Sequence, residues 1–130
     1  MVRCVGAVVL DRSGRLLVIL RGHAPSEGLW SVPGGRVEAG ESDAAALTRE
    51  VLEETGLVVT CGRLIGSVRR GAYDIHDYAA SVTGGVLRSG SDAAGARWVT
   101  PAELRALPVT PGLVEALTEW GVLSPSLGDE

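Results

Sequence analysis

Three glutamates in the segment 42–55 lie at spacings that place them on one face of a helix. Glu50, Glu53 and Glu54 fall within an arc of about 100° on a helical wheel, so they are neighbours at i, i+3 and i+4. Like charges at these spacings repel, and the last turns of a helix already carry partial negative charge, so each glutamate costs about a few tenths of a kcal/mol. Clustered carboxylates are the ligands that a hard divalent cation such as Mg2+ or Mn2+ requires. The pattern therefore indicates a metal site, with a solvated acidic face as the plain alternative.

The residues around this helix favour the metal site. The segment 32–35 reads Val-Pro-Gly-Gly, and paired glycines let the backbone come close to a ligand or a metal. Glu41 adds a carboxylate where the helix starts, although a negative charge is favourable there without any metal. Arg49 is the only nearby cation on the helix, and one guanidinium cannot neutralise three carboxylates.

The hydropathy pattern predicts the elements that position these residues. Strands are expected at 4–10, 16–20, 29–32, 57–68, 73–82 and 97–99, and helices at 42–55, at 100–107 and from 110 onward. The first two strands flank a tight turn at 11–14, which predicts a hairpin. Gly56 stops the first helix, and the segment 100–103 (Thr-Pro-Ala-Glu) has the form of a capping box. The chain, 1–130, is expected to be one layered α/β or α+β domain with a frayed tail at about 124–130.

Composition excludes several classes of function. The longest apolar runs, 5–10 and 16–20, are far shorter than the roughly 18 to 20 residues of a membrane-spanning helix, so insertion into a membrane is excluded. No secretory signal precedes the first strand, and a cytoplasmic protein is expected. The chain carries 16 acidic against 12 basic residues, a net charge of -4, which argues against binding to a nucleic-acid polymer.

The cysteines and histidines do not predict a zinc site. Neither Cys4 and Cys61 nor His23 and His76 have the spacing of zinc ligands. Both cysteines lie in apolar, strand-like segments, so they are expected to be buried free thiols.

The segment 35–57 resembles the signature box of the Nudix hydrolases. The family pattern is Gly, five residues, Glu, seven residues, Arg-Glu, an aliphatic residue, any residue, Glu-Glu, any residue, Gly and an aliphatic residue. The chain matches every position, with Gly35, Glu41, Arg49, Glu50, Val51, Glu53, Glu54, Gly56 and Leu57. A chance match in a chain this short is on the order of 10^-8. The segments before the box, the strands after it and the segment 98–103 are also similar to the family, so the resemblance covers most of the chain.

The resemblance implies a fold and a chemistry. The fold is an α/β/α sandwich around a mixed β-sheet, and the reaction is metal-dependent hydrolysis of a nucleoside diphosphate linked to another group X. The metal ligands implied by the family are Glu50, Glu53 and Glu54, with the carbonyl of Gly34 or Gly35 as a further ligand. Family members take the general base from a box glutamate or from a later loop; here Glu50 or Glu53 ranks above Asp92.

The resemblance also indicates structural and phosphate-binding roles. Arg49 is expected to orient a box glutamate together with Glu41. Arg21, at the end of the second strand, is the best candidate for a direct phosphate contact, because MutT-like members have an arginine there; the alternative is a solvated surface arginine. Arg69 and Arg70 are further candidates, although a charged strand end explains at least one of them.

Candidates for contact with the base or sugar lie on the strand expected at 73–82. The alternation of side chains along a strand puts Asp74, His76 and Tyr78 on one face, which is either a nucleoside contact or a satisfied polar face. Tyr73 follows the box at about the distance where dinucleoside-polyphosphate hydrolases have a tyrosine. Trp30 and Trp120 are expected to be core residues rather than stacking platforms.

Within the family, the sequence favours a (deoxy)nucleoside triphosphate, cleaved to the monophosphate and pyrophosphate. The chain is short, and it has no proline between Pro33 and Pro101, where ADP-ribose-cleaving members usually carry one. ADP-ribose and dinucleoside polyphosphates are the alternatives. The chain contains no asparagine, so it lacks the residue that MutT-like enzymes use to read an oxidised guanine.

A function of a different class is a non-catalytic domain that senses nucleotides. Such domains typically lose box carboxylates, and this chain has lost none. The expected partner is a small nucleotide, and a homodimer is left open.

Overall fold

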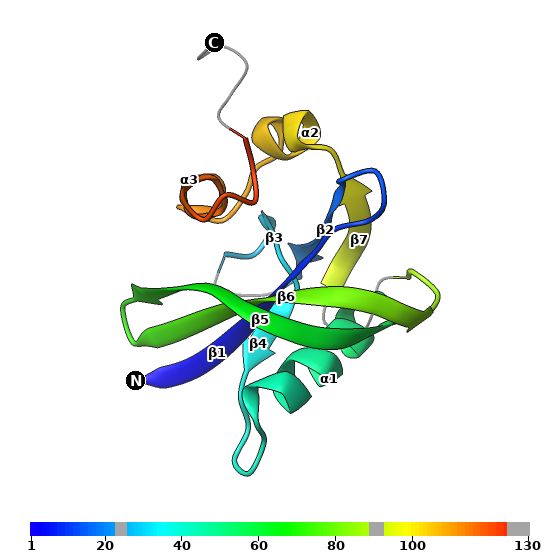
Figure 1. Ribbon diagram of the computed structural model, residues 1–130. Helices are drawn as coiled ribbons and strands as arrows, with labels where there is room; N and C mark the ends of the chain where they lie inside the picture. Colours follow the sequence, from blue (N-terminus) through cyan, green and yellow to red (C-terminus); the bar gives the residue numbers. More distant parts are fainter. Residues whose placement is uncertain (23–25, 89–92, 125–130) are drawn as a thin grey trace.

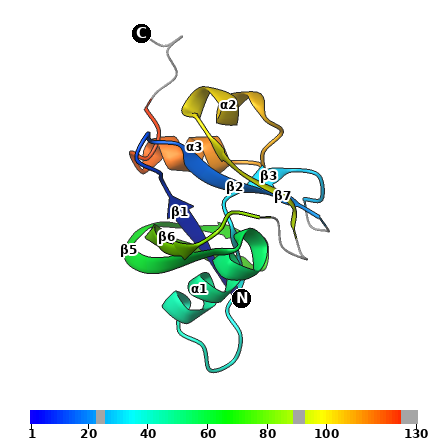
Figure 2. The ribbon, with the colours of Figure 1, turned by 90° about the vertical axis from the view of Figure 1, so that its right-hand side faces the viewer.

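The computed structural model describes residues 1–22, 26–88 and 93–124, and places them in three layers (Figure 1). The strands are β1 (Val2–Val9), β2 (Leu16–Arg21), β3 (Trp30–Ser31), β4 (Gly34–Arg36), β5 (Leu57–Arg70), β6 (Tyr73–Gly85) and β7 (Ala93–Val99), and the helices are α1 (Asp43–Thr55), α2 (Pro101–Ala106) and α3 (Leu113–Glu119). In both ribbon views α1 lies on one side of the strands and α2 and α3 lie on the other (Figures 1 and 2). The expected α/β/α sandwich is thus confirmed.

The strands form two sheets. The larger has the order β4-β1-β6-β5; β1 and β6 are parallel, and the other neighbours are antiparallel, so this sheet is mixed as expected. The smaller is antiparallel, with the order β3-β2-β7. No helix among the described residues is long and apolar enough to cross a membrane.

The expected hairpin at the start of the chain is wrong. β1 and β2 share a single antiparallel bridge, between Leu10 and Leu16, and then run into different sheets. The reason is that both edges of β1 are already paired, one with β4 and the other with β6. The turn at 11–14 still forms, because Asp11 Oδ1 accepts hydrogen bonds from the backbone N–H groups of Ser13 and Arg15.

Several element boundaries also differ from the expectation. Gly34–Arg36, expected to follow the end of a strand, forms the edge strand β4. The last helix begins at Leu113 rather than at 110, because Gly112 has a φ of 83° and so interrupts the helical backbone. The strands β5 and β6 run to Arg70 and Gly85, further than expected. Of the expected frayed tail, residues 125–130 lie outside the described residues.

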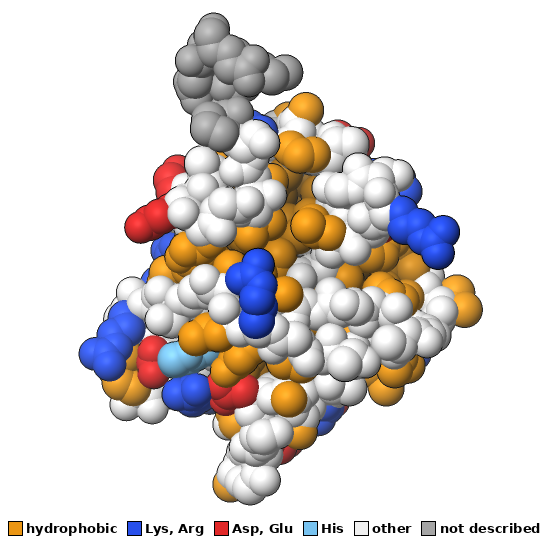
Figure 3. Space-filling model, viewed as in Figure 1, with side chains coloured by type: hydrophobic (Ala, Val, Ile, Leu, Met, Phe, Trp, Pro, Cys, Tyr) orange, Lys and Arg blue, Asp and Glu red, His pale blue; other side chains and the backbone are white. Residues whose placement is uncertain are grey.

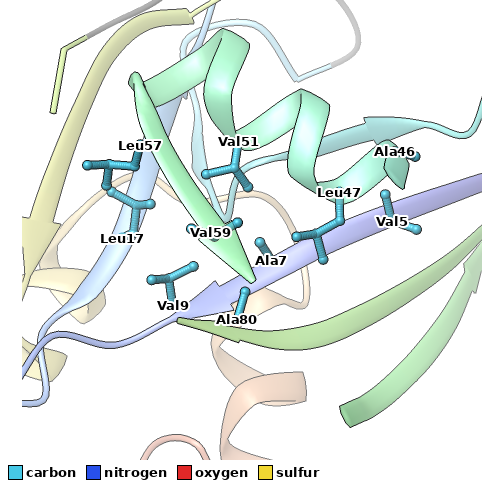
Figure 4. Packing of buried hydrophobic residues seen from close by; sticks show 10 residues of the cluster. All are labelled: Val5, Ala7, Val9, Leu17, Ala46, Leu47, Val51, Leu57, Val59 and Ala80. Carbon is cyan, nitrogen blue, oxygen red and sulfur yellow. The ribbon is translucent and has the colours of Figure 1, made fainter. Parts of the chain in front are cut away.

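The helix that carries the three glutamates is held by its caps and by one apolar face. Ser42 accepts a hydrogen bond from the Ala45 backbone N–H, and Gly56 ends the helix with a φ of 76°. Leu47 and Val51 point from α1 toward β1, where they pack in one of the two hydrophobic clusters (Figure 4). The second cluster joins β2 and β7 to α2 and α3, and includes Val18, Val99, Leu104 and Leu117. The first cluster thus holds α1 against the strands β1 and β5 of the larger sheet.

Cys4 and Cys61 are free, as expected, but each is only half-buried. Burial nevertheless raises the pKa of both thiols above the ordinary value.

Candidate active site

Arg49 is the centre of a charged network on α1. Its Nε and Nη2 donate hydrogen bonds to the two carboxylate oxygens of Glu41, at 2.8 and 2.9 Å. Its Nη1 donates to Glu50 Oε1 at 2.6 Å and lies 3.6 Å from Glu53 Oε1. The hydrogen bonds from Arg49 lower the pKa of Glu41 to about 2, and Glu41 in turn raises the pKa of Arg49. One guanidinium thus fixes the orientation of Glu41 and Glu50 together.

The paired glycines before α1 allow two close approaches. Gly34 lies against β1, where a β-carbon would come within 2.1 Å of the Val5 carbonyl oxygen. Gly35 lies against the Glu50 carboxylate, where a β-carbon would be 2.4 Å from Oε2. Glu54 is 5% exposed, and its Oε1 accepts a hydrogen bond of 2.8 Å from the Gly34 backbone N–H. The glycines therefore bring β4 into direct contact with two of the three glutamates.

A cavity of about 760 Å³ lies beside this contact. The larger sheet, with the order β4-β1-β6-β5, forms one side of it. Glu50 and Glu54 line the cavity next to β4, and Val68 of β5 lines it at the other edge of the sheet. Leu113 and Trp120, from α3 and its C-terminal end, line the side opposite the sheet. On the face seen in Figure 3, hydrophobic side chains gather between α3 and the strands β5 and β6. The cavity thus has a carboxylate wall, formed by Glu50 and Glu54, and an apolar wall, formed by Val68, Leu113 and Trp120.

The donor atoms at the carboxylate wall suit a hard divalent cation. Glu50 and Glu54 supply carboxylate oxygens, and the adjacent strand β4 supplies carbonyl oxygens. Glu53 does not line the cavity, and its side chain is 44% exposed beside Arg49. Among the described residues, no three His, Cys, Asp or Glu side chains are yet gathered around one point. Bringing Glu53 to the same cation as Glu50 and Glu54 requires its exposed side chain to turn.

The structure brings only part of the expected substrate residues to this cavity. Arg21 and Tyr73 line it, and so does Arg70. Arg69 does not; it projects from β5 with a side chain that is 74% exposed, 3.9 Å from Asp74.

His76 and Tyr78 are likewise outside the cavity, because they lie on the face of β6 that is turned toward α1. Tyr78 donates a hydrogen bond of 2.6 Å to Asp43 in the first turn of α1, and this bond raises the pKa of the tyrosine. His76 Nε2 is buried, 3.2 Å from Asp74 Oδ2. The expected alternation along β6 is correct, but the polar face that it selects packs against the helix.

The opposite face of β6 carries the residues that sequence reasoning missed. Ile75 and Asp77 line the cavity on the same face of β6 as Tyr73, next to the strand β1. Asp77 is 7% exposed, and burial raises its pKa to about 6, although the nearby His76 lowers it. The only signal in the sequence was an acidic residue between Ile75 and Ala79 on one face of the strand. Trp120, expected to be a core residue, packs on the second hydrophobic cluster and also lines the cavity. Asp92, the alternative base, lies outside the described residues.

The family model of the NUDIX domain matches residues 1–120. The chain belongs to the Nudix family. Its members generally need divalent metal ions, which agrees with the donor atoms of the carboxylate wall.

Curated relatives of this Nudix domain carry different substrate names. A Bacillus subtilis protein provisionally named an 8-oxo-dGTP diphosphatase is 39% identical over 100 residues, which cover 75% of this chain and 65% of that protein. A MutT-like protein of Streptomyces ambofaciens is 36% identical over 103 residues, or 77% of this chain and 64% of that protein. The ADP-ribose pyrophosphatase of Methanocaldococcus jannaschii is 33% identical over 91 residues, or 65% of this chain and 54% of that protein. The chain thus spans less than two thirds of the length of these relatives.

Solved structures show the same Nudix fold. A NUDIX hydrolase from Nitrosomonas europaea superposes with a TM-score of 0.81 at 20% identity, over 92% of this chain and 69% of that one. The Escherichia coli ORF135 protein superposes with a TM-score of 0.72 at 29% identity, over 97% of this chain and 94% of that one.

Proposed function

We propose that this chain is a metal-dependent pyrophosphohydrolase that cleaves a (deoxy)nucleoside triphosphate to the monophosphate and pyrophosphate. The observation that carries the proposal is the carboxylate wall: Glu50 and Glu54 line a cavity of nucleotide size, and Arg49 fixes Glu50 in place. The names of two relatives, an 8-oxo-dGTP diphosphatase and a CTP pyrophosphohydrolase, agree with it.

The acidic wall explains why a cation is required. A triphosphate is polyanionic, so Glu50, Glu53 and Glu54 would repel it without an intervening positive charge. The proposed ion is Mg2+ or Mn2+, held by these glutamates and the carbonyl of Gly35. A divalent cation held there would offset the repulsion between the glutamates and the phosphates and would lower the pKa of the attacking water.

The protein residues then have distinct tasks in the hydrolysis. The water oxygen bonds to a phosphorus atom, the anhydride P–O bond breaks, and pyrophosphate leaves with the electron pair. Glu50 or Glu53 takes the proton of the water, and Arg49 holds Glu50 in position for this transfer. Arg21, which lines the cavity, contacts the phosphates.

Two other substrates have support from particular observations. Tyr73 lines the cavity, which keeps a dinucleoside polyphosphate as an alternative. The relative from Methanocaldococcus jannaschii favours ADP-ribose. A domain that only senses nucleotides would bind them without turnover.

The direct test is a product assay over a substrate panel. The chain is incubated with NTPs, dNTPs, 8-oxo-dGTP, ADP-ribose and diadenosine polyphosphates, with Mg2+ and then with EDTA, and phosphate, pyrophosphate and AMP are measured. Pyrophosphate release from a triphosphate, abolished by EDTA, is the expected result. AMP release from ADP-ribose alone would overturn the substrate, and no product from any compound would overturn the enzymatic function.

A further inference from the structure

Asp77 is a buried carboxyl group without a protein partner in the part of the chain that the structure describes. Its side chain is 7% exposed and lines the cavity. Within residues 1–22, 26–88 and 93–124, burial and the neighbouring His76 act on this carboxyl group, and no hydrogen-bond donor does. A buried carboxylate is unfavourable unless hydrogen-bond donors compensate for the water that it has lost.

The fold makes room for this carboxyl group at the floor of the cavity. Gly34, Gly6, Asp77 and Gly66 lie side by side, one on each of the four strands of the larger sheet. A β-carbon on Gly6 would lie 2.1 Å from Asp77 Oδ1, so the carboxyl group lies across β1. A β-carbon on Gly66 would lie 2.2 Å from Trp120 Cε2, so the indole ring covers β5 on the other side of Asp77. The carboxyl group thus has the Trp120 indole on one side and, on the other, the edge strand β4, which contacts Glu50 and Glu54.

A metal ion does not account for Asp77. The surrounding wall includes Ile75, Val68, Leu113 and Trp120, and the guanidinium of Arg70 lies beside Gly112. The apolar part of this wall suits a planar ring better than a hydrated cation. Because Asp77 lines the cavity, a ligand there can bring hydrogen-bond donors to its carboxyl group.

We propose that Asp77 selects the nucleobase, by accepting hydrogen bonds from the adjacent ring N–H and exocyclic amino group of a guanine-type base. This inference rests on the proposed nucleotide substrate and names its base. An ionised carboxylate is an acceptor only, and its two oxygens match two adjacent donors. Uracil and thymine flank their ring N–H with carbonyl oxygens, and adenine and cytosine have a lone pair beside the amino group. Each of these bases would place an acceptor against the carboxylate.

The test measures binding rather than turnover, so that it does not depend on hydrolysis. Calorimetric titration of the native chain in Mg2+, which supplies the positive charge between the acidic wall and the phosphate, compares GMP with IMP, which lacks only the exocyclic amino group, and with AMP and UMP. We expect GMP to bind about tenfold more tightly than IMP and UMP. Equal affinity for GMP and IMP, or no binding of GMP, would overturn the assignment, and this arm requires no variant.

Two substitutions on β6 then locate the effect. In Asp77→Asn one oxygen becomes an amino group, which repels the donor edge of guanine but complements the amino group and lone pair of adenine. We expect GMP to bind about tenfold more weakly and AMP to bind as tightly or more tightly. Asp74→Asn, on the face turned toward α1, is the matched control and should change neither affinity. An equal loss of GMP and AMP in Asp77→Asn, with the fold intact by circular dichroism, would show that Asp77 does not read the base.

The two proposals can fail separately. Guanine preference in binding without any hydrolysis would remove the enzymatic function and leave the role of Asp77. Hydrolysis of all triphosphates with equal kcat/KM, together with equal binding of the monophosphates, would remove the role of Asp77 and leave the enzymatic function.

Discussion

Gly35 and the Glu50 carboxylate are in such close contact that a β-carbon on the glycine would lie 2.4 Å from Oε2. On its other side, Glu50 Oε1 accepts a hydrogen bond of 2.6 Å from Arg49. The carboxylate is therefore held between a strand backbone and a guanidinium, which limits its movement before any ligand binds. A metal ligand held in this way needs little rearrangement when a cation arrives.

Gly35→Ala should move the Glu50 carboxylate, because the new methyl group occupies its place. We expect kcat to fall about 100-fold, since a displacement of about 1 Å in an active site can have this effect. Steady-state kinetics on the best triphosphate would measure the loss. The matched control is Gly84→Ala, whose β-carbon would meet only Val58 Cβ, at an ordinary 3.7 Å. Native kcat in Gly35→Ala would contradict the contact.

Arg49→Lys should separate the position of the glutamates from their charge. Lysine keeps the positive charge but cannot donate to both oxygens of Glu41 and to Glu50 at once. We expect kcat and the apparent affinity for Mg2+ to fall about 10- to 100-fold, with KM for the nucleotide little changed. Arg15→Lys, which alters an ion pair with Asp11 in the turn after β1, serves as the control. An unchanged Mg2+ dependence would show that the guanidinium does not position Glu50.

Asp77 should make the native chain less stable as the pH rises from about 4 to 6. Burial raises its pKa from 3.8 to about 6, so the folded chain binds a proton over this range more strongly than the unfolded chain does. From this shift, the free energy of unfolding decreases by about 2 kcal/mol between pH 4 and pH 7. Asp77→Asn lacks this dependence. Urea denaturation measures the free energy of unfolding of both proteins at several pH values. As the pH rises, the variant should become more stable relative to the native chain by this amount. Parallel pH profiles would contradict the prediction.

Gly66→Ala should destabilise the contact between β5 and Trp120. The added methyl group would overlap the indole ring, and overpacking of this kind costs about 1–3 kcal/mol. In a Trp120→Leu background the ring is absent, so the same substitution should cost less than about 0.5 kcal/mol. The four proteins form a double-mutant cycle in urea denaturation. An equal cost in both backgrounds would place the indole elsewhere.

The sequence predicts the glutamate helix well because its signals are local. Ser42 and Gly56 bound the helix as caps, and the spacing of its residues sets which side chains share a face. The close approach at Gly34 and Gly35 is likewise readable as a pair of glycines before a helix. The box thus fixes the local structure of the carboxylate wall.

The rest of the cavity depends on packing between segments that lie far apart in the chain. Alternation along β6 separates Tyr73 and Asp77 from His76 and Tyr78, but it does not tell which of the two faces meets α1. The hairpin of the first two strands fails for a related reason, because the pairing of β1 with β4 and β6 is not local. Asp77 and Trp120 become neighbours of the site only when α3 is placed over β5.

The central claim is that the glutamates of α1 act together through a divalent cation, and Glu53→Gln tests it most directly. Glu53 is 44% exposed and lies 3.6 Å from Arg49 Nη1, and an exposed ion pair of this kind contributes little to stability, so its replacement should change the melting temperature little. We expect kcat/KM for the preferred triphosphate at saturating Mg2+ to fall at least about 100-fold. Glu119→Gln, an exposed glutamate of α3, should retain full activity. Native kcat/KM in Glu53→Gln would contradict the assignment of this helix as the metal-binding element.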